Sequence, residues 1–522
     1  MPEIDVAILG GGLAGNLLAR QLRRELPDAS VAVFERDTER TYKVGESTVE
    51  IASNYLVRRL GLSTYLYKEH LPKNGLRFFF DDRDKSAELP EMSEIGVHAF
   101  PPCPSFQMDR ARFERDLLQM NERDGAHVYV GARIADLALS DDGGRHRFRV
   151  TGSEGEGDWT ARWVVDATGR AGTLAKKKDL RLPEKQHRIA ASWARVTGVR
   201  DMDDFGSPEW HHRAHWTTRV LSTNHFLYPG YWIWFIPLRD GLTSIGVVSE
   251  KEQWDAARHK PEGLMSFMRE HRAAASLLEG AELVDIGAFT QLAFRTKHFF
   301  GSRWAAIGDA AAFTDPFYSP GSDFIALEND FLTDLVQRDL AGEDFAERLA
   351  LYDDFMQLRF EITMLIYQDQ YPTFGSYELM RAKAFFDTGL YYNLLFDPYA
   401  RDQHLDPRWL RTSLRRRDLS LGTTRSFGTL FRRIADEMMK SGTYWDGNVG
   451  RASLEGRENF GILETVGAPR SRREVNARND EIFEKTREML RDALGGDPAL
   501  FERLWNEGPG GGDVWAGLQP GA

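Results

Sequence analysis

The glycine motif Gly10-x-Gly12-x-x-Gly15 restricts the fold of this chain more than any other feature. It follows a short apolar run and precedes residues 13–26, whose apolar side chains recur with helical spacing. A second apolar run ends in Glu35, about 20 residues further on, where a ribose-binding acid belongs. In such a strand–turn–helix unit the glycines let backbone amides approach a pyrophosphate. The motif predicts a dinucleotide site, and a tight turn without ligand is the weaker alternative.

The composition excludes several other classes of protein. With 522 residues the chain exceeds one hydrophobic core, so two or three domains are expected. The single cysteine, Cys103, excludes an internal disulfide and a cysteine-based metal site. A net charge of -12 argues against nucleic acid as the main partner. No apolar run is long enough to cross a bilayer and the first residues lack a basic segment, so we expect a cytoplasmic protein without a signal peptide.

The order of apolar patterns predicts an α/β fold with a Rossmann-like dinucleotide-binding domain, an antiparallel-sheet substrate domain and a C-terminal helical region. Long β-branched and aromatic runs within residues 187–250 suit a sheet packed over a cavity. The expected boundaries are a module over 1–375, with nucleotide-binding parts at 1–75, 105–180 and 295–345 and substrate-sheet parts at 76–104 and 185–294, a helical region over 376–507, and a disordered tail over 508–522.

Two later motifs indicate which dinucleotide is bound. Residues 165–170 (VDATGR) end a strand in a small-residue turn, and Gly308-Asp309 follows another apolar strand. With the glycine motif, these resemble the FAD-dependent monooxygenase superfamily and imply a p-hydroxybenzoate-hydroxylase-like fold. The resemblance implies that Asp309 binds flavin hydroxyls and that Arg110, in Asp109-Arg110-Ala111-Arg112-Phe113, contacts the flavin side. The remaining cofactor-binding residues that it implies are Gly10, Gly12, Leu13, Ala14, Gly15, Glu35, Arg36, Glu46, Ser47, Asp166, Gly169, Gly308, Pro316 and Gly321.

A W-x-W-x-I-P segment carries a narrower resemblance. Flavin-dependent halogenases share this fold and this segment, which is Trp232-Ile233-Trp234-Phe235-Ile236-Pro237 here. The plain alternative is a strand with two indoles on one face, because residues i and i+2 point the same way. The resemblance implies that Trp232, Trp234, Ile236 and Pro237, with Phe78 and Tyr318, wall the passage between flavin and substrate.

Lys73 is the catalytic residue that the resemblance implies. It follows the Val44-Gly45-Glu46-Ser47-Thr48 loop and precedes Gly75 and a run of phenylalanines, as in halogenases. A surface lysine is usually only a solvated charge, and Lys68 is the nearby alternative.

The Asp315-Pro316 segment is the third marker of halogenases, which bind halide at backbone amides in this loop. Pro320 has no N–H, so Gly321 and Ser322 are the expected halide-binding residues. A flavin-contacting loop without halide remains the alternative. Tryptophan halogenases carry Glu where Tyr318 stands, so the resemblance is to the phenol- or pyrrole-type branch. The cluster His211-His212-x-x-His215 lacks a completing carboxylate, and no metal site is expected.

The resemblance implies a complete reaction. A separate flavin reductase supplies FADH2, O2 gives a flavin C4a-hydroperoxide, and bound chloride or bromide is oxidised to hypohalous acid. Lys73 then passes the halogen to an electron-rich aromatic substrate, free or tethered to a carrier protein, as in antibiotic biosynthesis and other secondary metabolism. The alternatives are an FAD-dependent aromatic hydroxylase or a flavin reductase of the same fold and, more remotely, a non-catalytic FAD-binding interaction protein.

Overall fold

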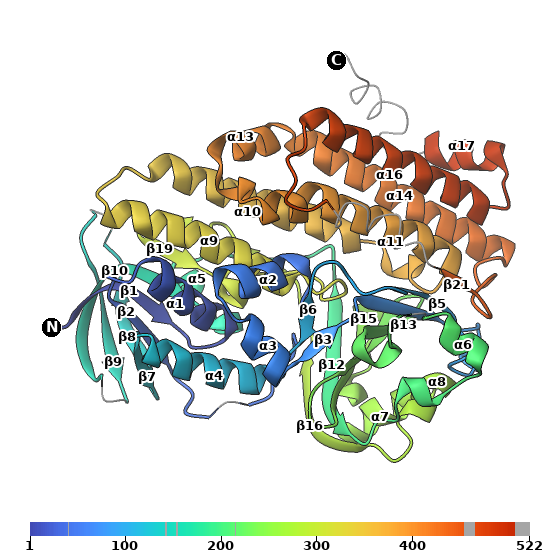
Figure 1. Ribbon diagram of the computed structural model, residues 1–522, viewed down its shortest axis with the longest axis horizontal. Coiled ribbons are helices and arrows are strands. Elements are labelled where there is room, and N and C mark those ends of the chain that lie inside the picture. Colours follow the sequence, from blue (N-terminus) through green and yellow to red (C-terminus); the bar gives the residue numbers. More distant parts are fainter. Residues whose placement is uncertain (40, 141–142, 153–154, 215, 454–464, 507–522) are drawn as a thin grey trace.

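The computed structural model describes residues 1–39, 41–140, 143–152, 155–214, 216–453 and 465–506. Figure 1 shows a sheet flanked by helices, a second sheet beside it, and a layer of long helices that lies across both. The tail expected to be disordered, 508–522, lies outside the described residues.

The first sheet is the predicted dinucleotide-binding unit. Its strand order is β18 (Phe300–Gly301), β19 (Trp304–Ala306), β10 (Gly157–Asp166), β1 (Glu3–Leu9), β2 (Val31–Glu35) and β7 (His127–Val130). The strands from β19 to β7 run parallel, and the antiparallel strands β8 (Arg133–Ala138) and β9 (His146–Thr151) extend from β10. On β1, Val6 and Ile8 pack with α1 (Leu13–Glu25), whereas Ala7 and Leu9 pack on the opposite face. Helix α4 (Arg110–Arg123) packs beside α1.

The second sheet is the one that the sequence predicts on the substrate side. Its order is β16 (Glu282–Phe289), β12 (Ile189–Thr197), β15 (Leu242–Glu250), β14 (Tyr231–Pro237), β13 (Thr223–Tyr228), β4 (Leu76–Phe80), β5 (Ser93–Gly96) and β21 (Ala452–Ser453). The expected antiparallel sheet is confirmed with one correction, because β4 pairs with β13, and β5 with β21, in parallel. Both parallel pairs join segments far apart in sequence, which no local turn forces into antiparallel order.

The C-terminal helices form the third layer. They are α9 (Gly321–Leu340), α10 (Ala346–Tyr367), α11 (Tyr377–Tyr391), the π-helix Tyr392–Phe396, α12 (Asp397–Ala400), α13 (Pro407–Arg415), α14 (Arg417–Ser441), α16 (Arg472–Ala493) and α17 (Pro498–Asn506). Helices α11, α14 and α16 enclose a core that includes Phe386, Phe427 and Phe483. Before these helices, residues 312–313 pair as strand β20, and α9 begins at Gly321. None of the described helices is long and apolar enough to span a membrane.

Short elements connect these layers. They are α2 (Glu50–Asn54), the π-helix Tyr55–Arg59, α3 (Ser63–Glu69), β3 (Leu71–Lys73), β6 (Ser105–Gln107), α5 (Thr173–Lys177), β11 (Arg181–Pro183), α6 (Pro208–His212), α7 (Pro261–Arg269), α8 (Arg272–Leu277), β17 (Phe294–Thr296) and β20 (Ala312–Phe313). Strands β3 and β6 pair with each other where the two large sheets meet, and this pair carries Lys73.

Candidate active site

The turn between β1 and α1 has the close contacts that require glycine. Gly10 has a φ of +109°, and a Cβ there would lie 2.4 Å from the Ala167 carbonyl oxygen. A Cβ on Gly15 would lie 2.1 Å from the Gly10 oxygen. Gly12 precedes α1 without a side-chain cap, so the first amides of the helix remain available to an anion. This cradle fits the pyrophosphate of FAD.

The end of β2 places Glu35 beside the glycine turn. One carboxylate oxygen of Glu35 accepts a hydrogen bond from the Gly11 amide at 2.6 Å, and the other accepts from the Asp37 amide at 2.7 Å. The buried acid thereby fixes the turn on which a ribose would lie. Arg36 points to solvent and pairs with Asp37 at 3.0 Å, so its contact with the cofactor stays a prediction.

Asp309 lies on the short helix Gly308–Ala310 after β19. Among the described residues its carboxylate has no hydrogen-bonding partner, and Arg170 and Arg110 lower its pKa while burial, the larger effect, raises it. Gly308 has a φ of +57°, and a Cβ there would lie 2.8 Å from the Cβ of Ala14, so this helix packs tightly on α1. An unpaired, partly buried carboxylate at this point fits the flavin hydroxyls.

Arg110 opens α4, which Asp109 caps by accepting the Ala111 amide at 2.9 Å. The Arg110 guanidinium pairs with Glu114 at 2.5 Å, and Lys43 pairs with the second oxygen of Glu114 at 2.6 Å. These two cations lower the pKa of buried Glu114, although its desolvation opposes them. The sequence interpretation missed Glu114 and Lys43, although the Arg110–Glu114 spacing of four was a signal for the pair.

Asp166 shapes the turn after β10. Its carboxylate accepts hydrogen bonds from the amide and the hydroxyl of Thr168, at 3.0 and 2.6 Å, and from the Leu174 amide at 2.6 Å. Gly169, with a φ of +61°, lies in the same turn. Both carboxylate oxygens therefore serve the turn itself, and direct contact of Asp166 and Gly169 with the cofactor stays a prediction.

The loop at 44–48 connects the flavin side to Lys73. Glu46 is buried against Arg195, with 3.0 Å between Oε1 and the guanidinium. The Nζ atom of Lys73 donates hydrogen bonds to the Ser47 hydroxyl and the Thr48 carbonyl oxygen, each at 2.8 Å. Lys73 is 3% exposed, and burial lowers its pKa to about 8 although Glu50 and Asp323 oppose the shift. Lys73 is therefore a buried, held amine, whereas the side chain of Lys68 is 78% exposed.

A stack of aromatic rings lies next to this amine. The ring centroid of Phe317 lies 5.4 Å from those of both Phe78 and Trp232. His225, which the sequence interpretation missed, lies between Phe78 and Trp232 at 5.3 Å from each, and burial lowers its pKa to about 3. The uncharged ring is therefore expected throughout the neutral range.

Trp232 and Trp234 were expected to wall the passage between flavin and substrate, but they do not line the described cavity. Trp232 donates to the Tyr371 hydroxyl at 3.1 Å, and Trp234 donates to the Ser244 hydroxyl at 3.2 Å. The described cavity is lined by Phe78 and Tyr318 but by none of Trp232, Trp234, Ile236 and Pro237. The indoles lie in the core behind Phe317, because β14 is a central strand whose side chains are nearly all buried. Their function as a wall stays a prediction.

The loop before α9 is held by a buried polar network. Asp315 accepts hydrogen bonds from the Tyr371 hydroxyl at 2.7 Å and the Phe317 amide at 2.9 Å, and His187 Nε2 lies 2.8 Å from it. Pro316 and Tyr318 follow, and α9 then begins at exposed Gly321 without a side-chain cap. The amides of Gly321 and Ser322 are thus the first of a long helix, a position that favours an anion.

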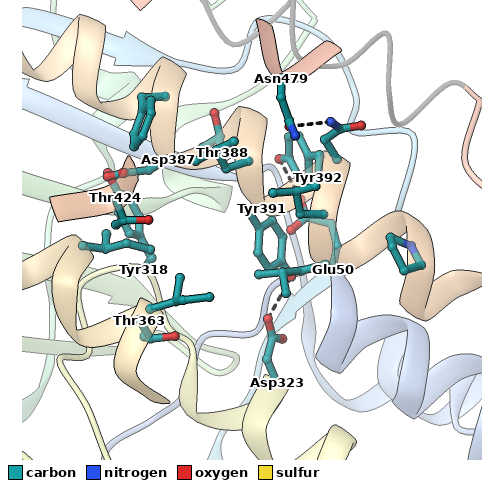
Figure 2. A pocket seen from close by; sticks show the side chains of 18 of the residues that line it. Glu50, Tyr318, Asp323, Thr363, Asp387, Thr388, Tyr391, Tyr392, Thr424 and Asn479 are labelled. Carbon is teal, nitrogen blue, oxygen red and sulfur yellow. Dashed lines mark hydrogen bonds between the residues drawn. The ribbon is translucent and has the colours of Figure 1, made fainter. Parts of the chain in front are cut away.

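A cavity of about 930 Å³ extends from this loop into the C-terminal helices. Lys73, Phe78 and Tyr318 line it on the sheet side, and many of its other lining residues come from α10, α11, α14 and α16. Figure 2 shows Tyr391 directed at Asp323 and Tyr392 at Glu50, with hydrogen bonds of 2.8 and 3.1 Å. Lys73 and the loop residues Tyr318 and Pro320 thus line one cavity, whereas Gly321 and Ser322 are not among its lining residues and their binding of halide stays a prediction.

Comparisons with known proteins agree with this geometry. A family model described as an FAD binding domain matches residues 3–323. The flavin-dependent halogenase chlA of Dictyostelium discoideum is 32% identical over 438 residues, which cover 77% of this chain and 72% of that protein. The chain belongs to the flavin-dependent halogenase family. A 1H-pyrrole-2-carbonyl-(peptidyl-carrier protein) chlorinase of Pseudomonas fluorescens is 27% identical over 341 residues, 61% of this chain and 72% of that protein.

Solved halogenases share the fold along nearly the whole chain. The halogenase PltM in complex with phloroglucinol and FAD has a TM-score of 0.66 at 16% identity, over 96% of this chain and 98% of that one. The sequence resemblance to halogenases of the phenol- or pyrrole-type branch is confirmed, as is the α/β fold with a helical C-terminus.

The halogenase cavity also contains residues that carried no sequence signal. Glu50, Asp323, Arg359, Tyr391 and Tyr392 line it, and none of these five belongs to a motif used in the sequence analysis. Among the described residues no group of three metal-ligating side chains occurs, and His215 lies outside the described residues.

Proposed function

We propose that this halogenase installs chlorine or bromine on an electron-rich aromatic ring, with Lys73 relaying hypohalous acid to the substrate. The observation that carries the proposal is the buried amine of Lys73, which lines the cavity and is hydrogen-bonded to the loop expected beside the flavin. A solvated lysine would not have these contacts. The exposed Lys68 pairs instead with its neighbour Glu69, at 3.5 Å.

The cofactor would be held by the glycine turn, by Glu35 and by Asp309, with Arg110 and the 44–48 loop on the flavin side. When bound and reduced by a separate flavin reductase, FAD supplies the oxygen activation that oxidises the halide. The first amides of α9, at Gly321 and Ser322, would hold chloride or bromide in the helix dipole.

The chain's own residues then control where the oxidised halogen goes. An ammonium group has three N–H donors, and two of those on Lys73 are taken by Ser47 and Thr48. The third would hold hypohalous acid in the cavity that Lys73 lines. The packed rings of Phe78 and Phe317 exclude water beside it, which matters because an unheld hypohalous acid would react without selectivity.

The substrate is proposed to be a small aromatic molecule, either free or tethered to a carrier protein. The support is the cavity, which is large enough for an aromatic ring with substituents. Among the similar proteins, the Pseudomonas fluorescens chlorinase is named for a pyrrole bound to a peptidyl-carrier protein. The structure of PltM was solved with phloroglucinol bound.

Lys73→Ala tests the proposal against Lys68→Ala as the matched control. Both proteins are supplied with reduced FAD, O2 and bromide, with a reactive phenol and monochlorodimedone as acceptors. We expect Lys73→Ala to lose about 100-fold or more of the brominated phenol while its FAD content and flavin oxidation remain normal. Lys68→Ala should match the native protein. Brominated phenol from Lys73→Ala at the native rate would refute the assignment, and an oxygenated phenol from the native protein would show a hydroxylase.

A further inference from the structure

Arg359 is a buried arginine whose guanidinium carbon lies 5.6 Å from the ring centroid of Phe324. It lies on α10, lines the cavity and is 4% exposed. Among the described residues no group accepts a hydrogen bond from its guanidinium or forms an ion pair with it, and its Nε atom is one of the buried nitrogens without a partner. A buried guanidinium is costly unless an anion pairs with it and accepts its hydrogen bonds. An anionic ligand in the cavity would supply that missing acceptor.

The nearest acid is already occupied. Asp323 accepts the Ala52 amide at 2.9 Å with one oxygen and the Tyr391 hydroxyl at 2.8 Å with the other. It lies close enough to lower the cost of charging both Arg359 and Lys73, since it raises the pKa of each against the effect of burial. Asp323 lines the same cavity as both cations, but its own hydrogen bonds are made to Ala52 and Tyr391.

Other arginines on the cavity differ from Arg359. Arg401 and Arg470 both pair with Asp397, at 2.5 and 2.7 Å, and Arg381 pairs with Glu378 at 2.7 Å. Arg408, on α13, also lines the cavity, but its side chain is exposed to solvent. Arg359 is buried and lines the cavity, and among the described residues no carboxylate pairs with it as Asp397 and Glu378 pair with those three arginines.

Resting on the proposed function, we propose that Arg359 binds a carboxylate of the aromatic substrate and so directs its ring toward Lys73. The planar guanidinium matches a carboxylate with two parallel hydrogen bonds. Phenols are largely uncharged at neutral pH, since the reference pKa of a phenol is about 10, whereas a carboxylate arrives as an anion. The substrate class is therefore a hydroxylated aromatic acid.

A matched pair of probes tests this inference without halogenation. 3,5-Dihydroxybenzoate and resorcinol share the dihydroxylated ring and differ in the carboxylate. Their dissociation constants are measured by calorimetry on the FAD-loaded oxidised protein, with Arg359→Met, Arg359→Lys and the control Arg408→Met. We expect the native protein to bind the benzoate at least about tenfold more tightly than resorcinol, and Arg359→Met to lose this preference. The dissociation constant of resorcinol should differ less than about twofold between Arg359→Met and the native protein.

The variants keep the outcome interpretable. Arg359→Lys retains the charge without the planar fork and should keep part of the preference, and Arg408→Met should keep all of it. Equal affinity for both probes in the native protein, or an unchanged preference in Arg359→Met with normal FAD content, would overturn the inference. The binding test needs no reduced flavin and no halide. If the native protein prefers the benzoate but halogenates neither probe, the result contradicts the proposed function and leaves the role of Arg359 in binding the carboxylate supported.

Discussion

The side-chain nitrogen of Lys73 lies 2.8 Å from the hydroxyl oxygen of Ser47, so the amine in the cavity is fixed by the loop expected beside the flavin. Ser47 also lies 2.9 Å from the Thr223 hydroxyl on β13. One hydroxyl thereby joins the loop at 44–48, the strand pair that carries Lys73 and the second sheet. Removing it should disturb the position of Lys73 more than the binding of FAD.

Ser47→Ala should therefore reduce halogenation while the protein keeps its flavin. The loss of a hydrogen bond to a charged group costs roughly 1.5–3 kcal/mol, so product formation should fall about 10-fold or more. Losing this acceptor also destabilises the ammonium, which should lower the pKa of Lys73 further. The control is Ser86→Ala, which removes an exposed hydroxyl bonded to Asp82 at 2.6 Å. Equal halogenation by the two variants would show that Ser47 does not position the lysine.

The pKa of Lys73 itself can be measured by labelling. Only the free amine reacts with acetic anhydride, so labelling of Lys73 followed by peptide mass spectrometry should show a midpoint near pH 8, with Lys68 as internal reference. The ammonium form, which we expect to hold hypohalous acid, then dominates below pH 8. The folded pKa lies below the unfolded value, so this lysine lowers stability below about pH 8, and the penalty is relieved as pH rises from 8 toward 10.5. A labelling curve without a midpoint near pH 8 would contradict this prediction.

The hydroxyl of Tyr371 is the centre of the buried polar network behind the loop that precedes α9. It donates to Asp315 at 2.7 Å and accepts from the Trp232 indole at 3.1 Å. In Tyr371→Phe the Asp315 carboxylate and the Trp232 indole N–H stay buried but lose this hydrogen bond. The free energy of unfolding, measured with urea, should therefore fall by roughly 1–3 kcal/mol. Tyr67→Phe, at a half-exposed ring, is the matched control. A stability equal to that of the control would show that the network does not support the loop.

Local patterns predicted the parts of this enzyme whose backbone conformation or strand order leaves a mark in the sequence. Gly10 and Gly15 had to be glycine because other backbone atoms lie where a Cβ would stand, and Lys73 was found from its spacing to Gly75. The wall of the cavity left no such mark. Arg359 and Tyr391 come from helices far along the chain, and only tertiary packing brings them to Asp323.

The indoles of Trp232 and Trp234 show what a sequence motif does not predict. Two indoles at positions i and i+2 of a strand share a face, as predicted, and their ring centroids lie 5.6 Å apart. Which surface that face meets depends on what packs against it, and here Phe317 lies against Trp232. The sequence pattern therefore predicted the strand and the shared face, but not the place of the rings relative to the cavity.

The glycine turn allows a prediction that separates cofactor binding from general stability. An alanine at Gly15 would place its Cβ 2.1 Å from the Gly10 carbonyl oxygen and 3.0 Å from Ile8 Cγ2, so α1 must move away from the turn. We expect Gly15→Ala to be purified with little FAD and to unfold at lower temperature, because such overpacking costs roughly 1–3 kcal/mol. The measurements are flavin absorbance per protein and the melting temperature with and without added FAD.

Gly422 provides the matched control for Gly15. It lies within α14, and a Cβ there would meet nothing within 4 Å. Gly422→Ala should therefore keep a full complement of FAD and gain roughly 0.5–1 kcal/mol, since alanine loses less backbone freedom than glycine on forming a helix. If Gly15→Ala also retained flavin and stability, the close approach of α1 to β1 would not be what forms the cofactor cradle.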